Sequence, residues 1–208
     1  AEDRETLRCQ SDLIAAISSL GNYAEAEKQL RSLIPVATRV LGAADRETLQ
    51  ARKRLAFALY NQGKPAEAEQ EYRAVLAIQQ RTLGPAHRDS LGTQSDLIKV
   101  LTTQGKKAEA EAEFRRQIAT ASRKLGARDK RTLYLRRQFA DFLLDAGKLA
   151  EAEKAYRPLV ADEARVLGPE DRETLLTRLH LAPALFLQGK QAEAETLLRD
   201  LLPVMTKV

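Results

Sequence analysis

The sequence predicts an all-α protein, an α-solenoid of five helix–turn–helix repeats. Two observations support this prediction. A motif of the type Asp-Arg-Glu-Thr-Leu returns every 42 residues, and five glycines keep the same interval: Gly21, Gly63, Gly105, Gly147 and Gly189. No insertion or deletion interrupts this register. A constant period of this length is typical of solenoids, whose repeats must stack because none buries its apolar face alone.

The first helix of each repeat is expected between a capping residue and the periodic glycine. In the second repeat, Leu49, Leu55 and Leu59 follow a helical spacing that places them on one stripe. Asp45 precedes this run, where its carboxylate can cap the free amides of the first turn. Gly63 follows the run and can end the helix in a left-handed conformation. These signals predict the helix and its turn.

The second helix of the repeat is expected to begin near Pro65, whose fixed φ suits the first helical position. Tyr72, Val75 and Leu76 then fall on one face. Gly84 and the proline after it predict the end of this helix.

An Ala-Glu-Ala-Glu motif follows each periodic glycine. Its second alanine is expected where the two helices of a repeat come closest: Ala26, Ala68, Ala110, Ala152 and Ala194. Glu67 and Glu69 are expected to project into solvent early in the helix, where negative charge suits the helix dipole. The motif is therefore interpreted as packing plus helix electrostatics, not as catalytic carboxylates.

Four prolines fall inside predicted helices: Pro35, Pro158, Pro183 and Pro203. An interior proline loses one backbone hydrogen bond and clashes with the carbonyl four residues earlier. A bend is therefore expected near each of them.

The five repeats span residues 1–42, 43–84, 85–126, 127–168 and 169–208, and we expect one solenoid domain over 1–208 that belongs to a longer protein. With 44% hydrophobic and 30% charged residues, the composition is that of a soluble folded chain. No apolar run approaches the roughly 20 residues of a membrane span, and no signal peptide is recognisable. A single cysteine, Cys9, is compatible with a cytoplasmic location.

The net charge of +5 is unevenly distributed. Residues 43–168 carry 24 Lys and Arg against 17 Asp and Glu, whereas the first and last repeats are each slightly acidic. This distribution favours an acidic partner.

The repeat resembles the tetratricopeptide repeat family in its 42-residue form, as in kinesin light chains and bacterial multidomain proteins. The matching pattern runs from Thr48 to Pro85 and includes "LAFALYNQGKPAEAEQEYR" and the closing "LGP". The resemblance implies a right-handed superhelix whose first helices line a concave groove that binds proteins or peptides. The paired asparagines of kinesin light chains are absent, since Lys53-Arg54 stands at their place in the second repeat.

Alignment of the repeats on their "LA" step gives a candidate protein-binding groove: Lys53, Phe57, Tyr60, Asn61, Ser95, Lys99, Tyr134, Arg137, Asp141 and Phe186. Three of these cations recur about once per repeat, which suits an extended acidic peptide. They can equally be solvated or paired with Asp141 and Asp145, and Phe57 and Tyr60 can equally be packing residues between repeats. Tyr134 and Phe186 are the best candidates for aromatic anchors.

Other function classes have little support in the sequence. His87 replaces the helix-start aspartate and is expected in a loop, and His180 lies inside a predicted helix without a nucleophile motif. We therefore expect no enzyme activity, cofactor, metal or small-molecule substrate. Nucleic-acid binding is disfavoured because the basic residues are interleaved with glutamates.

Two hypotheses remain: a protein-binding module that uses the groove, and a structural spacer or self-association element of a larger signalling protein. The second draws on an apolar C-terminal edge: Leu197, Leu201, Leu202, Met205 and Val208. An exposed apolar patch of this kind marks an interaction surface.

Overall fold

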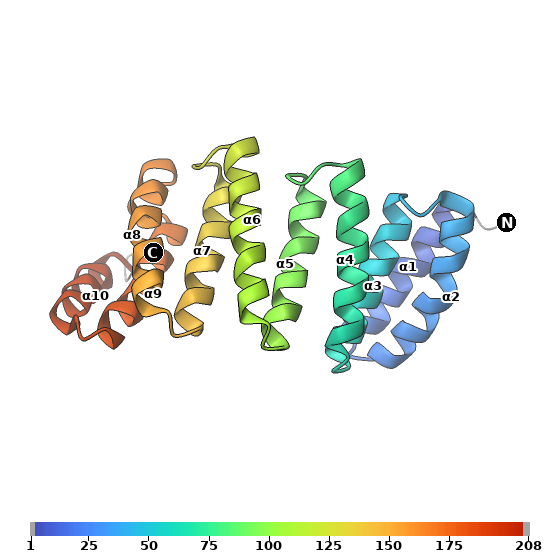
Figure 1. Ribbon diagram of the computed structural model, residues 1–208, viewed down its shortest axis with the longest axis horizontal. Coiled ribbons are helices and arrows are strands. Elements are labelled where there is room, and N and C mark those ends of the chain that lie inside the picture. The colour runs from blue at the N-terminus through green and yellow to red at the C-terminus, as the bar shows by residue number, and fades with distance from the viewer. Residues whose placement is uncertain (1–2, 206–208) are drawn as a thin grey trace. The chain divides into compact units, whose positions relative to one another are not determined.

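A computed structural model describes residues 3–205 of the chain, and Val208 of the predicted C-terminal edge lies outside them. These residues form ten helices that alternate as first and second helices of five repeats (Figure 1). Their bounds are α1 Arg4–Ser19, α2 Tyr23–Leu41, α3 Arg46–Asn61, α4 Pro65–Thr82, α5 Arg88–Thr103, α6 Lys107–Leu125, α7 Lys130–Asp145, α8 Leu149–Val166, α9 Arg172–Leu187 and α10 Gln191–Met205. The predicted all-α repeat architecture is confirmed.

The chain divides into two compact units, with the boundary between Glu113 and Phe114 inside α6. In the first unit, each helix from α1 to α5 packs on the next, and α1 also contacts α3. In the second unit, α7 to α10 pack in the same sequential way, and α7 contacts α9. The helices α1, α3, α7 and α9 therefore each pack against the second helix of their own repeat, and α1 and α7 also contact the first helix of the following repeat.

The helix boundaries follow from the capping residues predicted from sequence. The Asp45 carboxylate accepts a hydrogen bond from the Glu47 amide at 2.9 Å, and Gly63 adopts a φ of +75° at the turn. His87 lies in the loop directly before α5, as predicted, and it has a capping role there. Its Nδ1 accepts a hydrogen bond from the Asp89 amide at 3.2 Å, so it caps α5 as the aspartates cap other first helices.

The periodic alanine is fully buried between helices, as predicted. Ala68 has no exposed surface, and the same holds for Ala26, Ala110 and Ala152. The helices also run through all four interior prolines. The bends expected at Pro35, Pro158, Pro183 and Pro203 remain a prediction, as does the handedness of the superhelix.

The prediction for the second glutamate of the motif was wrong. Glu69 is only 9% exposed, and its carboxylate accepts hydrogen bonds from Arg73 at 2.8 Å, from Gln104 at 2.9 Å and from Lys106 at 2.7 Å. Gln104 and Lys106 belong to the turn of the next repeat. The glutamate therefore ties one repeat to the next instead of facing solvent.

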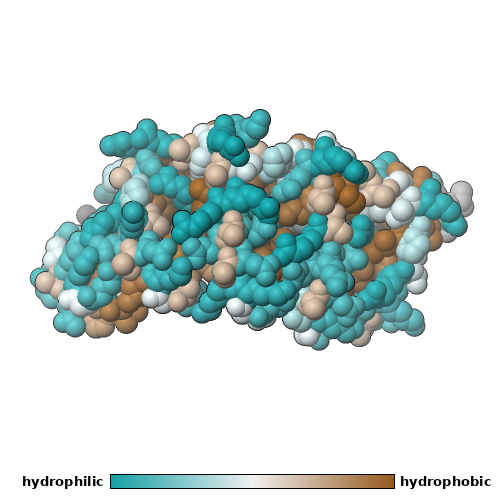
Figure 2. Space-filling model, in the orientation of Figure 1, coloured by the Kyte–Doolittle hydropathy of each residue, from teal (hydrophilic) through white to brown (hydrophobic). Residues whose placement is uncertain are grey.

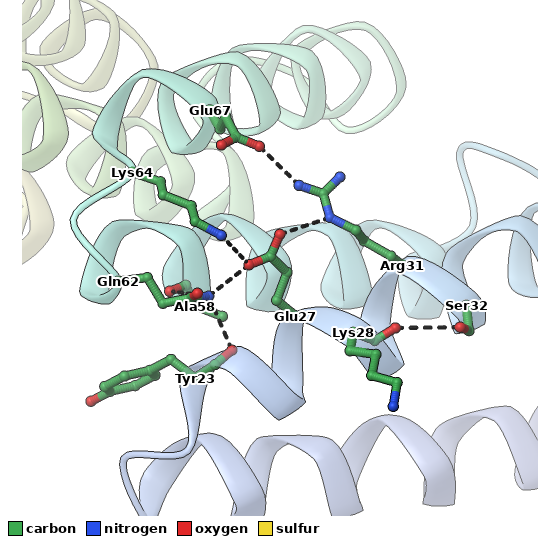
Figure 3. Close-up of polar contacts among 9 residues, drawn as sticks. All are labelled: Tyr23, Glu27, Lys28, Arg31, Ser32, Ala58, Gln62, Lys64 and Glu67. Carbon is green, nitrogen blue, oxygen red and sulfur yellow. Dashed lines mark hydrogen bonds and ion pairs between the residues drawn. The ribbon is translucent and has the colours of Figure 1, made fainter.

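The same arrangement recurs one repeat earlier (Figure 3). Glu27 accepts hydrogen bonds from Gln62 at 2.8 Å and Lys64 at 2.7 Å, while Arg31 joins it to Glu67 of the following repeat at 2.9 Å. We call this group the glutamate clasp: the second glutamate of the motif with the arginine four residues later and the glutamine and lysine of the next turn. Glu153, Arg157, Gln188 and Lys190 occupy the same repeat positions in the second unit, where Arg157 and Lys190 bond to Glu153.

The clasp changes the ionisation of its glutamates. Lys64, with Arg31 and Gln62, lowers the pKa of Glu27 to about 2 against the opposing effect of burial. Burial alone would raise the pKa of Glu69, but Lys106, Arg73 and Gln104 outweigh it and lower the pKa to about 2. Lys190 and Arg157 lower the pKa of Glu153 in the same way, also to about 2. These carboxylates are therefore charged and paired at neutral pH.

Figure 2 shows that hydrophilic side chains cover most of the face in view, and apolar atoms lie between them.

Candidate protein-binding groove

The first unit contains a cavity of about 470 Å³ between its first helices. Residues of α1, α3 and α5 form its sides, and Tyr23, Leu30 and Tyr72 of the second helices α2 and α4 complete it. Its remaining lining residues are Ile14, Ala15, Ser18, Ser19, Gln50, Lys53, Arg54, Phe57 and Asp96. We call this cavity the groove cavity.

Phe57 and Tyr23 give the groove cavity an aromatic side. The Phe57 ring is 45% exposed and meets the Tyr23 ring edge-on, with 6.2 Å between the ring centroids. Phe57 therefore combines the two roles considered from sequence, because it packs against the preceding repeat and still presents nearly half of its surface. A partly exposed, fixed aromatic ring is a suitable anchor for an incoming side chain.

The polar side of the groove cavity joins neighbouring repeats through charges. Lys53 lies 3.3 Å from Asp96 of the next repeat, and Arg54 lies 2.8 Å from Asp12 of the previous one. Lys53 is therefore paired, but with Asp96 and not with the aspartates considered from sequence. Ser18 adds an unused group: it is buried, and its Oγ has no hydrogen-bond partner among the described residues.

Four other predicted residues of this unit lie beside the groove cavity, not in its lining. The Tyr60 hydroxyl is 2.9 Å from the Thr103 Oγ1, and the Lys99 ammonium lies 5.2 Å from the centre of the Tyr60 ring. Lys99 is exposed, whereas Asn61 uses its amide to donate to the Phe57 carbonyl at 2.8 Å. Ser95 is half-buried on α5. Tyr60 and Lys99 thus form a pair of an aromatic ring and a cation beside the groove cavity.

The remaining four predicted residues belong to the second unit. Arg137 pairs with Glu173, and its guanidinium lies 5.7 Å from the centre of the Tyr134 ring, which is 51% exposed. Phe186 is also exposed. Within residues 3–205, the ion-pair partner of Asp141 is a histidine and not a lysine or arginine. It accepts a hydrogen bond from the Tyr156 hydroxyl at 2.6 Å and lies 2.9 Å from His180 Nδ1.

The group of Asp141, Tyr156 and His180 was not foreseen from sequence. The three residues come from α7, α8 and α9, and only the helical period places them together. Burial and the hydrogen bond to Asp141 raise the pKa of Tyr156, which therefore stays protonated and donates. The hydrogen bonds of this group join α7 to α8 and to α9, so it connects repeats four and five.

Metal sites and membrane-spanning helices were searched for among the described residues. Within residues 3–205, no group of three or more His, Cys, Asp or Glu side chains is placed to hold a metal ion. Over the same range, no helix is both long and apolar enough to cross a membrane.

Stacked helical hairpins with an aromatic and charged cavity between their first helices define a helical-repeat protein with a groove. Models of the tetratricopeptide repeat match residues 48–89 and 129–207. The chain belongs to the tetratricopeptide repeat family, as the sequence pattern predicted.

Solved structures show the same fold. The Podosopora anserina putative kinesin light chain with nearly identical TPR-like repeats is 25% identical, with a TM-score of 0.83 over 100% of this chain and 98% of that one. BtubC from P. vanneervenii is 16% identical, with a TM-score of 0.79 over 98% and 81%. YrrB, described as a TPR protein with an unusual peptide-binding site, is 14% identical, with a TM-score of 0.55 over 94% and 84%. No curated protein matches the chain.

Proposed function

We propose that this chain is a protein-interaction module that binds an extended peptide segment in the groove cavity. The observation that carries the proposal is the combination of the exposed Phe57 ring, the Lys53 ammonium and the unpartnered Ser18 hydroxyl around one cavity. An apolar anchor site with a few convergent polar groups is the usual character of a recognition site. The peptide-binding site of YrrB supports the idea that this fold can carry such a function.

The segment is expected to be partly acidic, because repeats two to four carry the excess of basic residues. Its exposed charge contacts, including those to Lys99, are worth about 0.2–1 kcal/mol each and are screened by salt. Binding is therefore expected to be modest in affinity and to weaken as the salt concentration rises.

The test is selection of peptides from a displayed random library, followed by calorimetric titration of the selected sequences. Phe57→Ala introduces the residue that the first repeat carries at the equivalent position, Ala15, and should weaken binding about tenfold or more. Val40→Ala is the matched control, because Val40 is similarly exposed at 41% but does not line the groove cavity. Equal effects of the two substitutions, or no selected peptide at all, would contradict the proposal.

Self-association through the last repeat is a second candidate function. On α10, Leu198, Leu202 and Met205 are 43%, 66% and 41% exposed. Glu195 stands at the clasp position of this repeat, but within the described residues its ion pair is with Arg199 of the same helix. Sedimentation velocity over a range of concentrations tests this candidate: Leu202→Glu should abolish association, whereas Leu20→Glu, at an 86% exposed position of the first repeat, should leave it unchanged. A monomer at every concentration would exclude it.

A further inference from the structure

A second cavity, of about 500 Å³, adjoins the groove cavity and shares Gln50 and Lys53 with it. It lies where repeats two and three meet. The first turns of α3 and α5 and the end of α4 form its lining. We call it the junction cavity. A ligand that occupies the groove cavity can therefore continue into it past the two shared residues.

Gln79 of α4 lines the junction cavity and is only 4% exposed. Its side-chain oxygen Oε1 has no hydrogen-bond partner among the described residues. A buried amide oxygen without a donor lowers stability, and native proteins retain few of them. A bound molecule that brings a donor group to this buried oxygen would satisfy it.

The junction cavity is also positively charged. Arg46, Lys53 and Arg88 line it, against the single carboxylate of Asp89. Lys53 is engaged with Asp96 at 3.3 Å, but neither arginine forms an ion pair within residues 3–205. Two guanidinium groups without carboxylate partners suit a carboxylate, which each can bind through two parallel hydrogen bonds.

A cavity at the same repeat positions in the second unit shows what distinguishes this one. That cavity, of about 370 Å³, has Glu163 in place of Gln79 and Asp171 in place of His87. Burial raises the pKa of Glu163, which shows that the site is poorly suited to a negative charge. Arg137, which replaces Lys53, is tied to Glu173. The two cavities therefore occupy the same repeat positions but differ in charge. The junction cavity has more cations than carboxylates, whereas the cavity in the second unit has the acidic residues Glu163 and Asp171.

We propose that the junction cavity binds an acidic residue of the peptide segment that enters the groove cavity. Arg46 and Arg88 hold its side-chain carboxylate, and its main-chain N–H donates a hydrogen bond to Gln79 Oε1. The cavity in the second unit does not accept such a residue, because Glu163 and Asp171 repel it. This inference rests on the proposed function, since it specifies one residue of the segment.

The test uses the whole chain, labelled with ¹⁵N, and a small probe in place of the unidentified peptide. N-acetyl-aspartate N,N-dimethylamide contains the carboxylate and a single N–H, that of the aspartate main chain. It should shift the Gln79 side-chain amide signals and those of the first turns of α3 and α5 at millimolar concentration. The asparagine analogue, which lacks the charge, and the analogue methylated on the aspartate nitrogen, which lacks the donor, should each bind at least about fivefold more weakly.

Substitutions locate the site. Arg46→Gln and Arg88→Gln remove exposed side chains that form no ion pair with any of the residues described, and each should weaken probe binding about two- to fivefold. Lys130→Gln, at the position equivalent to Arg46 in the second unit, is the matched control and should have no effect. Equal binding of the aspartate and asparagine probes, no shift of the Gln79 amide, or equal effects of all three substitutions would overturn the inference.

The outcomes separate this inference from the proposed function. Selected peptides that bind in a Phe57-dependent way, without preference for an acidic residue and without sensitivity to Arg46→Gln, leave the proposed function standing and refute the junction cavity. An aspartate probe that binds as predicted, while no peptide binds to the groove cavity, supports the junction cavity and refutes the proposed function.

Discussion

Replacement of Glu69 by glutamine tests the glutamate clasp, the contact that joins successive repeats. Glutamine has nearly the same shape but no charge, so Lys106 and Arg73 lose their ion pairs with Glu69, which is only 9% exposed. Arg73 keeps its ion pair with Glu109. Gln104 keeps a possible acceptor. The substitution therefore removes the ion pairs of Glu69, including the one with Lys106 of repeat three, and leaves the packing unchanged.

The size of the effect follows from the pKa of Glu69, which is lowered from 4.5 to about 2. Because one pKa unit corresponds to about 1.4 kcal/mol, the full shift sets an upper limit of about 3 kcal/mol. Lys106 and Arg73 have side chains that are 38% and 42% exposed, so water screens part of this interaction. We therefore expect Glu69→Gln to lower the free energy of unfolding by about 2 kcal/mol at pH 7.

The difference should depend on pH in a defined direction. Since the pKa of Glu69 is lower in the folded state, its contribution is fully present above the unfolded value of 4.5 and is lost as the pH falls toward about 2. The stabilities of wild type and Glu69→Gln should therefore differ at pH 7 and converge between pH 4.5 and pH 2.

Urea denaturation followed by circular dichroism, supported by hydrogen exchange at the junction, measures the difference. Two controls isolate the clasp. Glu67→Gln changes the exposed glutamate of the same motif, and Glu195→Gln changes the clasp position of the last repeat, where the ion pair is with Arg199. Each should cost less than about 0.5 kcal/mol. A similar loss from all three substitutions, or a Glu69→Gln difference independent of pH, would refute the clasp.

Three further predictions concern the packing, the turns and a buried acid. Ala68 is fully buried, so Ala68→Leu should destabilise the fold by about 1–3 kcal/mol in chemical denaturation. Ala66→Leu, at an exposed position of the same helix, should change stability little. Equal effects of the two substitutions would contradict the close approach of the helices at Ala68. Gly63→Ala should cost about 1–2 kcal/mol because its φ is +75°, whereas Gly92→Ala inside α5, where a Cβ meets nothing within 4 Å, should stabilise by up to about 1 kcal/mol. A Gly63→Ala protein as stable as the wild type, or more stable, would refute the assignment of the turn. Glu163→Gln should raise stability at neutral pH. The pKa of Glu163 is raised above its ordinary value of 4.5, so the contribution of this carboxyl group to stability falls as the pH rises from 4.5 through the folded value. A loss of stability at pH 7 in a pH-dependent denaturation series would show that the charge is compensated.

The helices and turns could be predicted from sequence because their signals are local. Asp45, Gly63 and Pro65 act within a few residues of the boundary that each one sets. The constant period then repeats the same information five times. His87 was expected only as a loop residue at the helix-start position, and the structure adds that its Nδ1 performs the role of the aspartate oxygen.

The polar contacts between repeats could not be predicted in the same way. The environment of Glu69 depends on Lys106, 37 residues later, and an early helical glutamate is usually solvated. The partner of Asp141 is likewise set by the stacking of α9 on α7, which brings His180 to it. The sequence did contain a signal for Gln79 that the analysis of the repeats missed. Repeats one and three have an alanine at the position of Gln79, so a polar side chain at this core position was unusual.

The most direct test of the central claim is hydrogen exchange of the chain with and without a peptide selected for binding. If the segment lies in the groove cavity, protection should increase in α3 around Phe57 and in the first half of α5, and Phe57→Ala should abolish the increase. Protection confined to α10, or to the solvent-facing side of α2 and α4, would contradict the claim and place the interaction surface elsewhere.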